Sequence, residues 1–319
     1  MVAGVGLHIA AMFPAYPGNP ATPVVQTPYE VAVYTCLEVG WALAALLVLT
    51  RWSFRGGVAL GAGLGVVEVG LIVTDLTIGF QVSDGSAAGI WLAIAGLASG
   101  LAGVLYGAGT ATMGTDLALA GPEVPPFAHP YSQPPSQAPG SGPGPRPRPA
   151  AMSPVRALLS VMVAIVAVAA FWPSWDHYHL VYATGQVRDI NLGNAFDQPT
   201  AIMAGELVAG LAVGCAVVIA AFWRDALVGA WATVGTAIAL ASQVISGAVP
   251  VSEPISQLLG TSNTAALNLS ASSVSLTGYW YVDLGATAAL VLLAAWAALE
   301  ARRARPAPVP ATHEGPTAP

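Results

Sequence analysis

The chain has 319 residues, of which 55% are hydrophobic and only 8% charged, and its formal net charge is −6. A typical soluble domain has about 25% charged residues, so this composition excludes an ordinary water-soluble protein and indicates a membrane protein. Lysine is absent and all ten basic residues are arginines, which excludes a retinal or pyridoxal Schiff base and a P-loop ATPase, because each needs a lysine.

The first segment of the chain, Met1–Phe13, is apolar but too short to cross a bilayer. As a helix it would span only about 20 Å, and it lacks the basic start of a signal peptide. Seven later runs are long enough, since about 20 helical residues cross a hydrocarbon core of about 30 Å. These runs are Val31–Thr50, Val58–Phe80, Ala87–Thr110, Val155–Trp172, Ala201–Trp223, Ala226–Val249 and Tyr279–Leu299. The sequence therefore predicts an all-α transmembrane bundle of seven spans plus a short N-terminal stub.

The arginines predict how the chain is oriented. Nine of the ten fall on one side of the predicted spans, and only Arg188 falls on the other. The positive-inside rule places the nine in the cytoplasm, together with the C-terminus. The loops 81–86, 173–200 and 250–278 then face outward from the plasma membrane. The acids are spread over both sides, so the net charge indicates no nucleic-acid partner; the predicted partner is the lipid bilayer.

The two halves of the chain resemble each other, which predicts an internal repeat. Matching features recur in the same order: Ala11–Tyr16 with Ala170–Trp175, Glu38 and Glu206 placed 17 and 18 residues before Arg55 and Arg224, and Gly89-Ile90-Trp91 with Gly278-Tyr279-Trp280. Both halves cross in the same direction, so we expect two parallel four-helix repeats. Met1–Phe13 is then a truncated first helix, either because the true start lies upstream or because the helix has decayed.

The repeat divides the chain into four parts. Residues 1–119 form the first membrane repeat and residues 154–305 the second. Between them, residues 120–153 are rich in Pro, Gly, Ser and Gln, a composition that cannot bury a core, so we predict a disordered cytoplasmic linker. Residues 306–319 form a similar disordered tail.

Five acids fall within the predicted spans, where an ionised carboxylate is costly and usually pairs, protonates or lines water. Glu68 is near the middle of its span, and Asp75, seven residues further on, shares roughly the same helical face. These two are the leading candidates for binding a proton, a cation or a substrate. The other candidates are Glu38, Glu206 and Asp283; these three also fit an alternative role as structural groups that reach interfacial water.

The outer loop contains Asp176, His177 and His179, a weak candidate for a metal site, because alternating residues share a side only if the loop is extended. Its tryptophans and tyrosines fit an interfacial aromatic belt better. The two cysteines, Cys36 and Cys215, are too few for a disulfide framework or a zinc site. No nucleophile elbow or zincin motif is present, so an enzyme is disfavoured and no cofactor is predicted.

The second half is similar to a group of polytopic membrane proteins of unknown function from high-GC Gram-positive bacteria. The segments that carry the resemblance are Gly193-Asn194-Ala195-Phe196 with Pro199, Ala204-Gly205-Glu206-Leu207, Phe222-Trp223-Arg224, Ala241-Ser242-Gln243-Val244-Ile245-Ser246 and Leu276-Thr277-Gly278-Tyr279-Trp280. The resemblance covers roughly residues 155–300. It implies a plasma-membrane location in an actinobacterium-like cell and brings no activity and no functional residues.

Two functions fit these observations. The first is an ion-coupled transporter of small solutes, in which Glu68 and Asp75 bind the coupling ion or the substrate. It depends on the repeat and on the buried acids, features that are associated with transporters but do not demonstrate transport. The alternative is a membrane scaffold or sensor that presents its outer loops to envelope components.

Overall fold

The computed structural model describes residues 1–16, 22–24, 28–50, 53–82, 88–119, 153–192, 200–223, 225–252 and 268–303. Within these ranges seven helices are long and apolar enough to cross a membrane, and one shorter apolar helix precedes them. The predicted all-α bundle of seven spans and a stub is therefore confirmed. The predicted disordered linker, residues 120–153, lies outside the described residues except for Ser153, and the predicted disordered tail, residues 306–319, lies wholly outside them.

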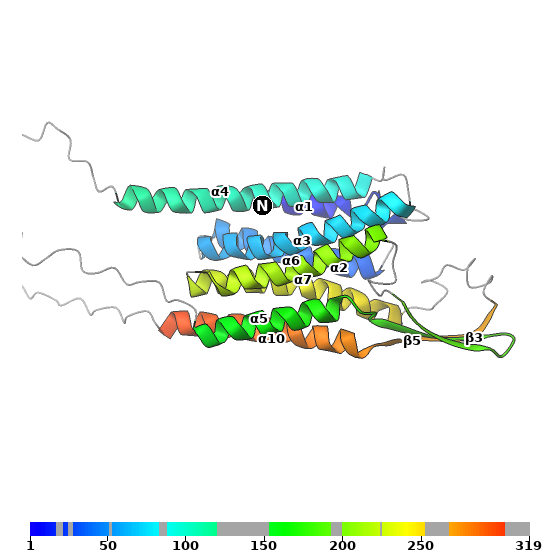
Figure 1. Ribbon diagram of the computed structural model, residues 1–319. Helices are drawn as coiled ribbons and strands as arrows, with labels where there is room; N and C mark the ends of the chain where they lie inside the picture. The colour runs from blue at the N-terminus through cyan, green and yellow to red at the C-terminus, as the bar shows by residue number, and fades with distance from the viewer. Residues whose placement is uncertain are drawn as a thin grey trace, which may run out of the picture.

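The helices lie side by side along one common direction (Figure 1). They are α1 (Val2–Ala11), α2 (Pro28–Leu49), α3 (Phe54–Val82), α4 (Ala88–Leu119), α5 (Pro154–Phe171), α6 (Thr200–Ala221), α7 (Ala226–Ser252) and α10 (Gly278–Arg303). Local sequence sets several of their ends. Ser153 caps α5 by accepting a hydrogen bond from the Arg156 backbone, and Pro154 takes the first helical position, where its missing N–H is not needed. Asp225 caps α7 in the same way, through the backbone N–H of Leu227.

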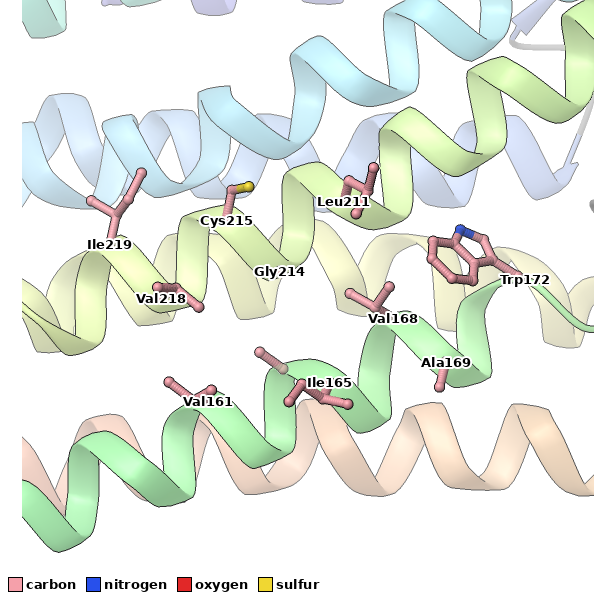
Figure 2. Close-up of a pocket in the computed structure, with 11 residues that line it drawn as sticks. Val161, Ile165, Val168, Ala169, Trp172, Leu211, Gly214, Cys215, Val218 and Ile219 are labelled. Atoms are coloured by element: carbon pink, nitrogen blue, oxygen red, sulfur yellow. The ribbon is translucent and has the colours of Figure 1, made fainter.

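A groove runs between α5 and α6 on the surface of the bundle (Figure 2). Its volume is about 540 Å³, and apart from Trp172 and Cys215 its lining is alanine, glycine and aliphatic side chains such as Val161 and Leu211. Such a lining suits hydrocarbon and offers no partner to a charged or polar solute. We assign no binding site to it.

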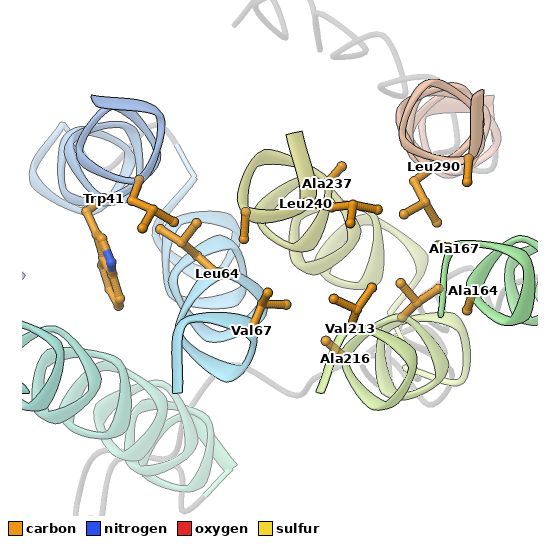
Figure 3. Packing of buried hydrophobic residues seen from close by; sticks show 14 of the residues in the cluster. Trp41, Leu64, Val67, Ala164, Ala167, Val213, Ala216, Ala237, Leu240 and Leu290 are labelled. Carbon is orange, nitrogen blue, oxygen red and sulfur yellow. The ribbon is translucent and has the colours of Figure 1, made fainter. Parts of the chain in front are cut away.

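Helices α3 and α7 form the centre of the bundle. About two thirds of the span in each is buried, 67% in α3 and 61% in α7, against 33–41% in the other five. A continuous cluster of buried side chains connects the helices, from Trp41 of α2 through Leu64 of α3 and Leu240 of α7 to Leu290 of α10 (Figure 3). The remaining helices surround this pair and expose aliphatic side chains outward, as helices do in lipid.

Glycines let α3 and α7 approach closely. A Cβ atom on Gly63 would collide with the backbone oxygen of Ala232, and one on Gly235 would collide with that of Leu60. A backbone atom cannot move away as a side chain can, so both positions require glycine at this crossing.

The helices of the two halves meet in corresponding pairs. In the first half α2 packs on α3, α3 on α4, and α1 on both α4 and α2. In the second half α6 packs on α7, α7 on α10, and α5 on both α10 and α6. Between the halves α3 meets α7, while α3 with α6 and α2 with α7 form a matching pair of contacts. The internal repeat itself stays a prediction from the sequence.

One end of the bundle carries a small antiparallel sheet that extends beyond the helices (Figure 1). Its strands are β3 (Asp176–Tyr182), β4 (Val187–Leu192) and β5 (Leu269–Leu276), in the order β4-β3-β5. A shorter pair, β1 (Ala15–Tyr16) with β2 (Thr22–Pro23), follows α1. Segments 173–200 and 250–278 were expected to be loops, but their described residues contain the three strands β3, β4 and β5. The hairpin from β3 to β4 turns at Gly185, whose φ of 82° is a left-handed conformation that favours glycine.

Candidate functional site

Helix α1 brings a histidine into the interior of the bundle. His8 is 1% exposed, and its imidazole occupies the space where a Cβ atom on Gly96 of α4 would lie. One turn earlier, a Cβ on Gly4 would lie 2.9 Å from the Gly96 backbone oxygen. The glycines on both helices therefore allow a backbone approach that places His8 against α3 and α2.

Glu68, in the middle of α3, lies next to this histidine. The Nδ1 atom of His8 is 3.1 Å from Oε1 of Glu68, an ion-pair distance outside hydrogen-bond angles. The indole N–H of Trp41 donates a hydrogen bond of 2.6 Å to the other oxygen, Oε2. Both oxygens of a carboxylate that is 3% exposed thus face a nitrogen of a neighbouring helix.

Glu38 of α2 completes the group. Its Oε1 atom lies 3.8 Å from Nδ1 of His8, and the residue is 9% exposed. Neither of its oxygens accepts a hydrogen bond within the described part of the chain. We call His8, Glu38, Glu68 and Trp41 the His8 cluster.

Charge balance decides what the His8 cluster can do. Two carboxylates and one imidazole are neutral as a set when they hold two titratable protons, whichever groups carry them. Releasing one proton leaves a negative charge at membrane depth, which costs about 3 kcal/mol at a helix centre on insertion scales. Among the described residues, His8 is the only basic side chain within ion-pair distance of either acid. The cluster therefore offers three titratable groups between which protons can be shared.

Of the other acids predicted as site residues, Asp283 has a described side chain, which lies apart from this cluster. Asp283 is completely buried in α10, which packs on α5 and α7, and neither of its carboxylate oxygens has a hydrogen-bond partner among the described residues. Asp75 lies in α3 and Glu206 in α6, but their side chains are outside the described residues. The two helices cross at this level, where a Cβ on Gly205 would lie 2.9 Å from Thr74 Cα.

The three candidate metal ligands of the outer loop lie on strand β3 and are divided between its two faces. His177 and His179 share the solvent-exposed face, while Asp176 lies on the opposite face with the buried side chains of Tyr178 and Leu180. Burial raises the pKa of Asp176 to about 6; burial and the Asp176 charge together raise the pKa of Tyr178 to about 12. In the described ranges, no three His, Cys, Asp or Glu side chains form a ready-made metal site.

Two members of the His8 cluster, His8 and Trp41, were not predicted from the sequence. The signal for His8 was its place as the only ionisable side chain in an otherwise apolar segment, Met1–Phe13. The signal for Trp41 was weaker: an indole three residues after Glu38, in a span where an aromatic residue usually just packs.

Comparisons with known protein families, with curated proteins and with solved structures find no match for this chain. The fold itself defines the class. The chain is an integral membrane protein whose described residues include seven helices able to cross a bilayer, and a titratable cluster is buried in its first half.

Proposed function

We propose that this protein is an ion-coupled transporter of small solutes and that the coupling ion is a proton bound by the His8 cluster. One observation carries the proposal. An imidazole lies 3.1 Å and 3.8 Å from two carboxylates, all of them buried in an apolar bundle. Ionisable residues at membrane depth are costly and usually mark an ion or substrate pathway.

The ligand chemistry favours a proton over a metal cation. Alkali and alkaline-earth cations need several oxygen ligands, about six to eight for Ca²⁺. Here the oxygens of Glu68 already face an indole N–H and an imidazole nitrogen, and an N–H group cannot bind a cation. A proton needs only one acceptor, and three are available.

The free-energy cost of proton release would couple proton movement to solute movement. Losing a proton from the neutral cluster leaves an uncompensated charge, so release is favoured only when water or a cationic group reaches the site. A conformation that opens the cluster to one side, or a solute that brings a positive charge, meets that condition. Proton release and solute movement are then linked.

We place the protein in the plasma membrane with its sheet facing outward, and we retain the repeat and the actinobacterial relationship as part of the proposal. Arg55, Arg156 and Arg303 lie at the bundle end opposite the sheet, which supports this orientation. The corresponding helix pairs of the two halves support a parallel repeat.

A second candidate function is a scaffold or sensor that presents its outer surface to envelope components. The observation in its favour is the three-stranded sheet, in which β3, β4 and β5 form one structured surface outside the helices. This function does not need the buried acids to exchange protons.

The two functions are separated by proton flux in liposomes that contain the purified protein and a trapped pH-sensitive dye. A panel of cationic and neutral small solutes is added outside, and the variants are Glu68→Gln and His8→Asn. The matched control is Ser242→Ala, because Ser242 is equally buried but bonds only to its own helix backbone. Transport predicts a solute-driven proton flux that both cluster variants abolish and the control retains.

Thermal stability over a pH series checks that the variants are folded. A solute that binds only the folded protein raises stability by about 2.7 kcal/mol at a hundredfold excess over Kd. If no solute drives flux or raises stability, and Glu68→Gln behaves as wild type at every pH, the proposal of transport is wrong. The scaffold or sensor function then replaces it.

A further inference from the structure

The solvent-exposed face of the outer sheet carries a second polar cluster, which the proposed function does not use. His177 and His179 on β3 lie directly opposite Asn191 and Asp189 on β4. The side chains of His177, His179 and Asp189 are 40%, 46% and 55% exposed, so the cluster is open to solvent. On the other side of β3 the facing residues are Ser275 and Ser273, whose small side chains leave the face uncovered.

Asn191 sets the state of the His177 ring. Its amide oxygen lies 2.8 Å from Nδ1 of His177. An amide oxygen can only accept, so Nδ1 carries a hydrogen, and in the neutral ring Nε2 is the nitrogen with the lone pair. Metal-binding histidines are held in this way, with the second ring nitrogen donating to a fixed oxygen.

The free nitrogen faces a second acceptor. Nε2 of His177 lies 3.6 Å from Oδ1 of Asp189, which is beyond hydrogen-bond distance, and in the neutral ring both atoms are acceptors. Two ligands about 2.1 Å from a tetrahedral zinc ion are about 3.4 Å apart. The gap between these two atoms is thus close to that required by a shared metal ion.

His179 supplies a third ligand within reach. Its Nδ1 atom lies 2.7 Å from the same Asp189 oxygen, a hydrogen-bond distance. An ion would have to replace this hydrogen bond, which is why the three donors do not form a ready-made site. The side chains of His179 and Asp189 are 46% and 55% exposed, so no packed neighbour encloses either of them during this exchange.

We propose that this face of the sheet binds a divalent transition-metal ion of the zinc class. Nε2 of His177 and the Asp189 carboxylate are its first ligands, His179 is its third ligand, and Asn191 positions His177. Nitrogen and carboxylate ligands together select Zn²⁺, Ni²⁺ or Cu²⁺ over Mg²⁺ and Ca²⁺. The site is independent of proton transport, since it lies outside the bundle.

The experiment is calorimetric titration of Zn²⁺ into the full-length protein in detergent, carrying no histidine tag. One ion per chain is expected, with no binding of Mg²⁺. His177→Ala and Asp189→Asn should each weaken binding by at least about tenfold, and Asn191→Ala by about 10- to 100-fold. Asn191→Asp should restore binding, because it keeps an acceptor opposite Nδ1 of His177.

The matched control is Asp176→Asn, on the opposite face of the same strand, which should bind Zn²⁺ as wild type does. The proposal is wrong if no stoichiometric binding occurs, or if Asp176→Asn weakens binding as much as Asp189→Asn. Far-ultraviolet circular dichroism and thermal stability of each variant show whether the fold is kept. If Asn191→Ala and Asn191→Asp are both folded and bind equally, the positioning role of Asn191 is wrong.

Discussion

In the first half of the bundle α1 meets α4 through glycines and buries His8, whereas in the second half α5 meets α10 and buries Arg156 against Glu300. The helices pair in the same order in both halves. The ionisable groups, however, lie at different depths. The His8 cluster is near the middle of α3, while Arg156 and Glu300 lie at the ends of their helices, where the Glu300 side chain is still 30% exposed.

This difference teaches that one helix arrangement can serve two purposes. An ion pair near a helix end can keep one partner partly in water, as the 30% exposed Glu300 side chain does, so two opposite charges are enough to join two helices. A charge at mid-depth has no water and must share protons with its neighbours. In the proposed function the first half exchanges protons through the His8 cluster, while the Arg156–Glu300 pair of the second half joins two helices.

The largest effect is expected from breaking the Arg156–Glu300 pair. Glu300→Gln leaves a completely buried guanidinium without its counter-charge, and we expect a loss of about 3 kcal/mol of unfolding free energy. That is the low end for such pairs, because Glu300 is partly exposed. Unfolding by a denaturing detergent in mixed micelles measures the loss, and proton flux in liposomes should be unchanged.

A control for this prediction lies on the same helix. Arg303 is exposed at the end of α10, and Arg303→Gln should change stability by less than about 0.5 kcal/mol. If Glu300→Gln abolishes proton flux in a folded protein, the second half also takes part in proton exchange, and the proposed difference in role between the two halves is wrong.

The next effect compares equivalent glycines in the two halves. Gly96 and Gly285 each lie seven residues after the glycine of the matched motifs, Gly89 and Gly278. A Cβ on Gly96 collides with the His8 ring, so Gly96→Ala should cost about 1–3 kcal/mol and abolish proton flux. A Cβ on Gly285 meets nothing within 4 Å, so Gly285→Ala should be neutral or stabilising by up to about 1 kcal/mol.

Unfolding and proton-flux measurements on the two variants, side by side, check this prediction. Equal losses of stability would mean that the contact between Gly96 and His8 contributes nothing specific. A stable Gly96→Ala protein that still moves protons would remove His8 from the proposed mechanism.

The smallest effect concerns the sheet. Because burial raises the pKa of Asp176 from 3.8 to about 6, the folded protein favours the protonated carboxyl. This contribution to stability is fully present below about pH 4 and is lost as the pH rises through 6. Asp176→Asn should therefore be more stable than wild type above pH 6, by about 1 kcal/mol after allowance for partial exposure.

Melting temperatures of both proteins from pH 3 to pH 8 test this sign. The difference between the two curves should grow between pH 4 and pH 6. A difference that does not change with pH would indicate altered packing instead of titration. A difference that grows between pH 4 and pH 6 would assign this pH response to Asp176 in the outer sheet, whereas the titratable cluster of the first half is buried in the bundle.

The spans could be predicted from the sequence because hydrocarbon thickness imposes a length and a composition on each of them. The predicted run Val31–Thr50 and helix α2, Pro28–Leu49, differ by only a few residues. The outer strands were not predicted, since segments 173–200 and 250–278 were expected to be loops. Tyr178 and Leu180 do alternate with two histidines in the pattern of a half-buried strand, but β5 pairs with β3 from almost a hundred residues away.

The candidate site could be predicted only in part. The depth of Glu68 marked it as unusual, since the cost of a mid-span carboxylate can be judged from its position alone. Its partner could not be found in the same way. His8 belongs to a segment too short to cross the bilayer, and no local pattern places that segment against Gly96, 88 residues further along the chain.

The crossing of α3 and α7 restricts how the sequence can vary. At Gly63 and Gly235 an added methyl group would meet a backbone oxygen, so no change of rotamer can accommodate it. Even alanine there would push the two halves apart and open the cluster of buried side chains between them. Two positions that cannot accept even a methyl group therefore have no side chain and lie outside both proposed sites.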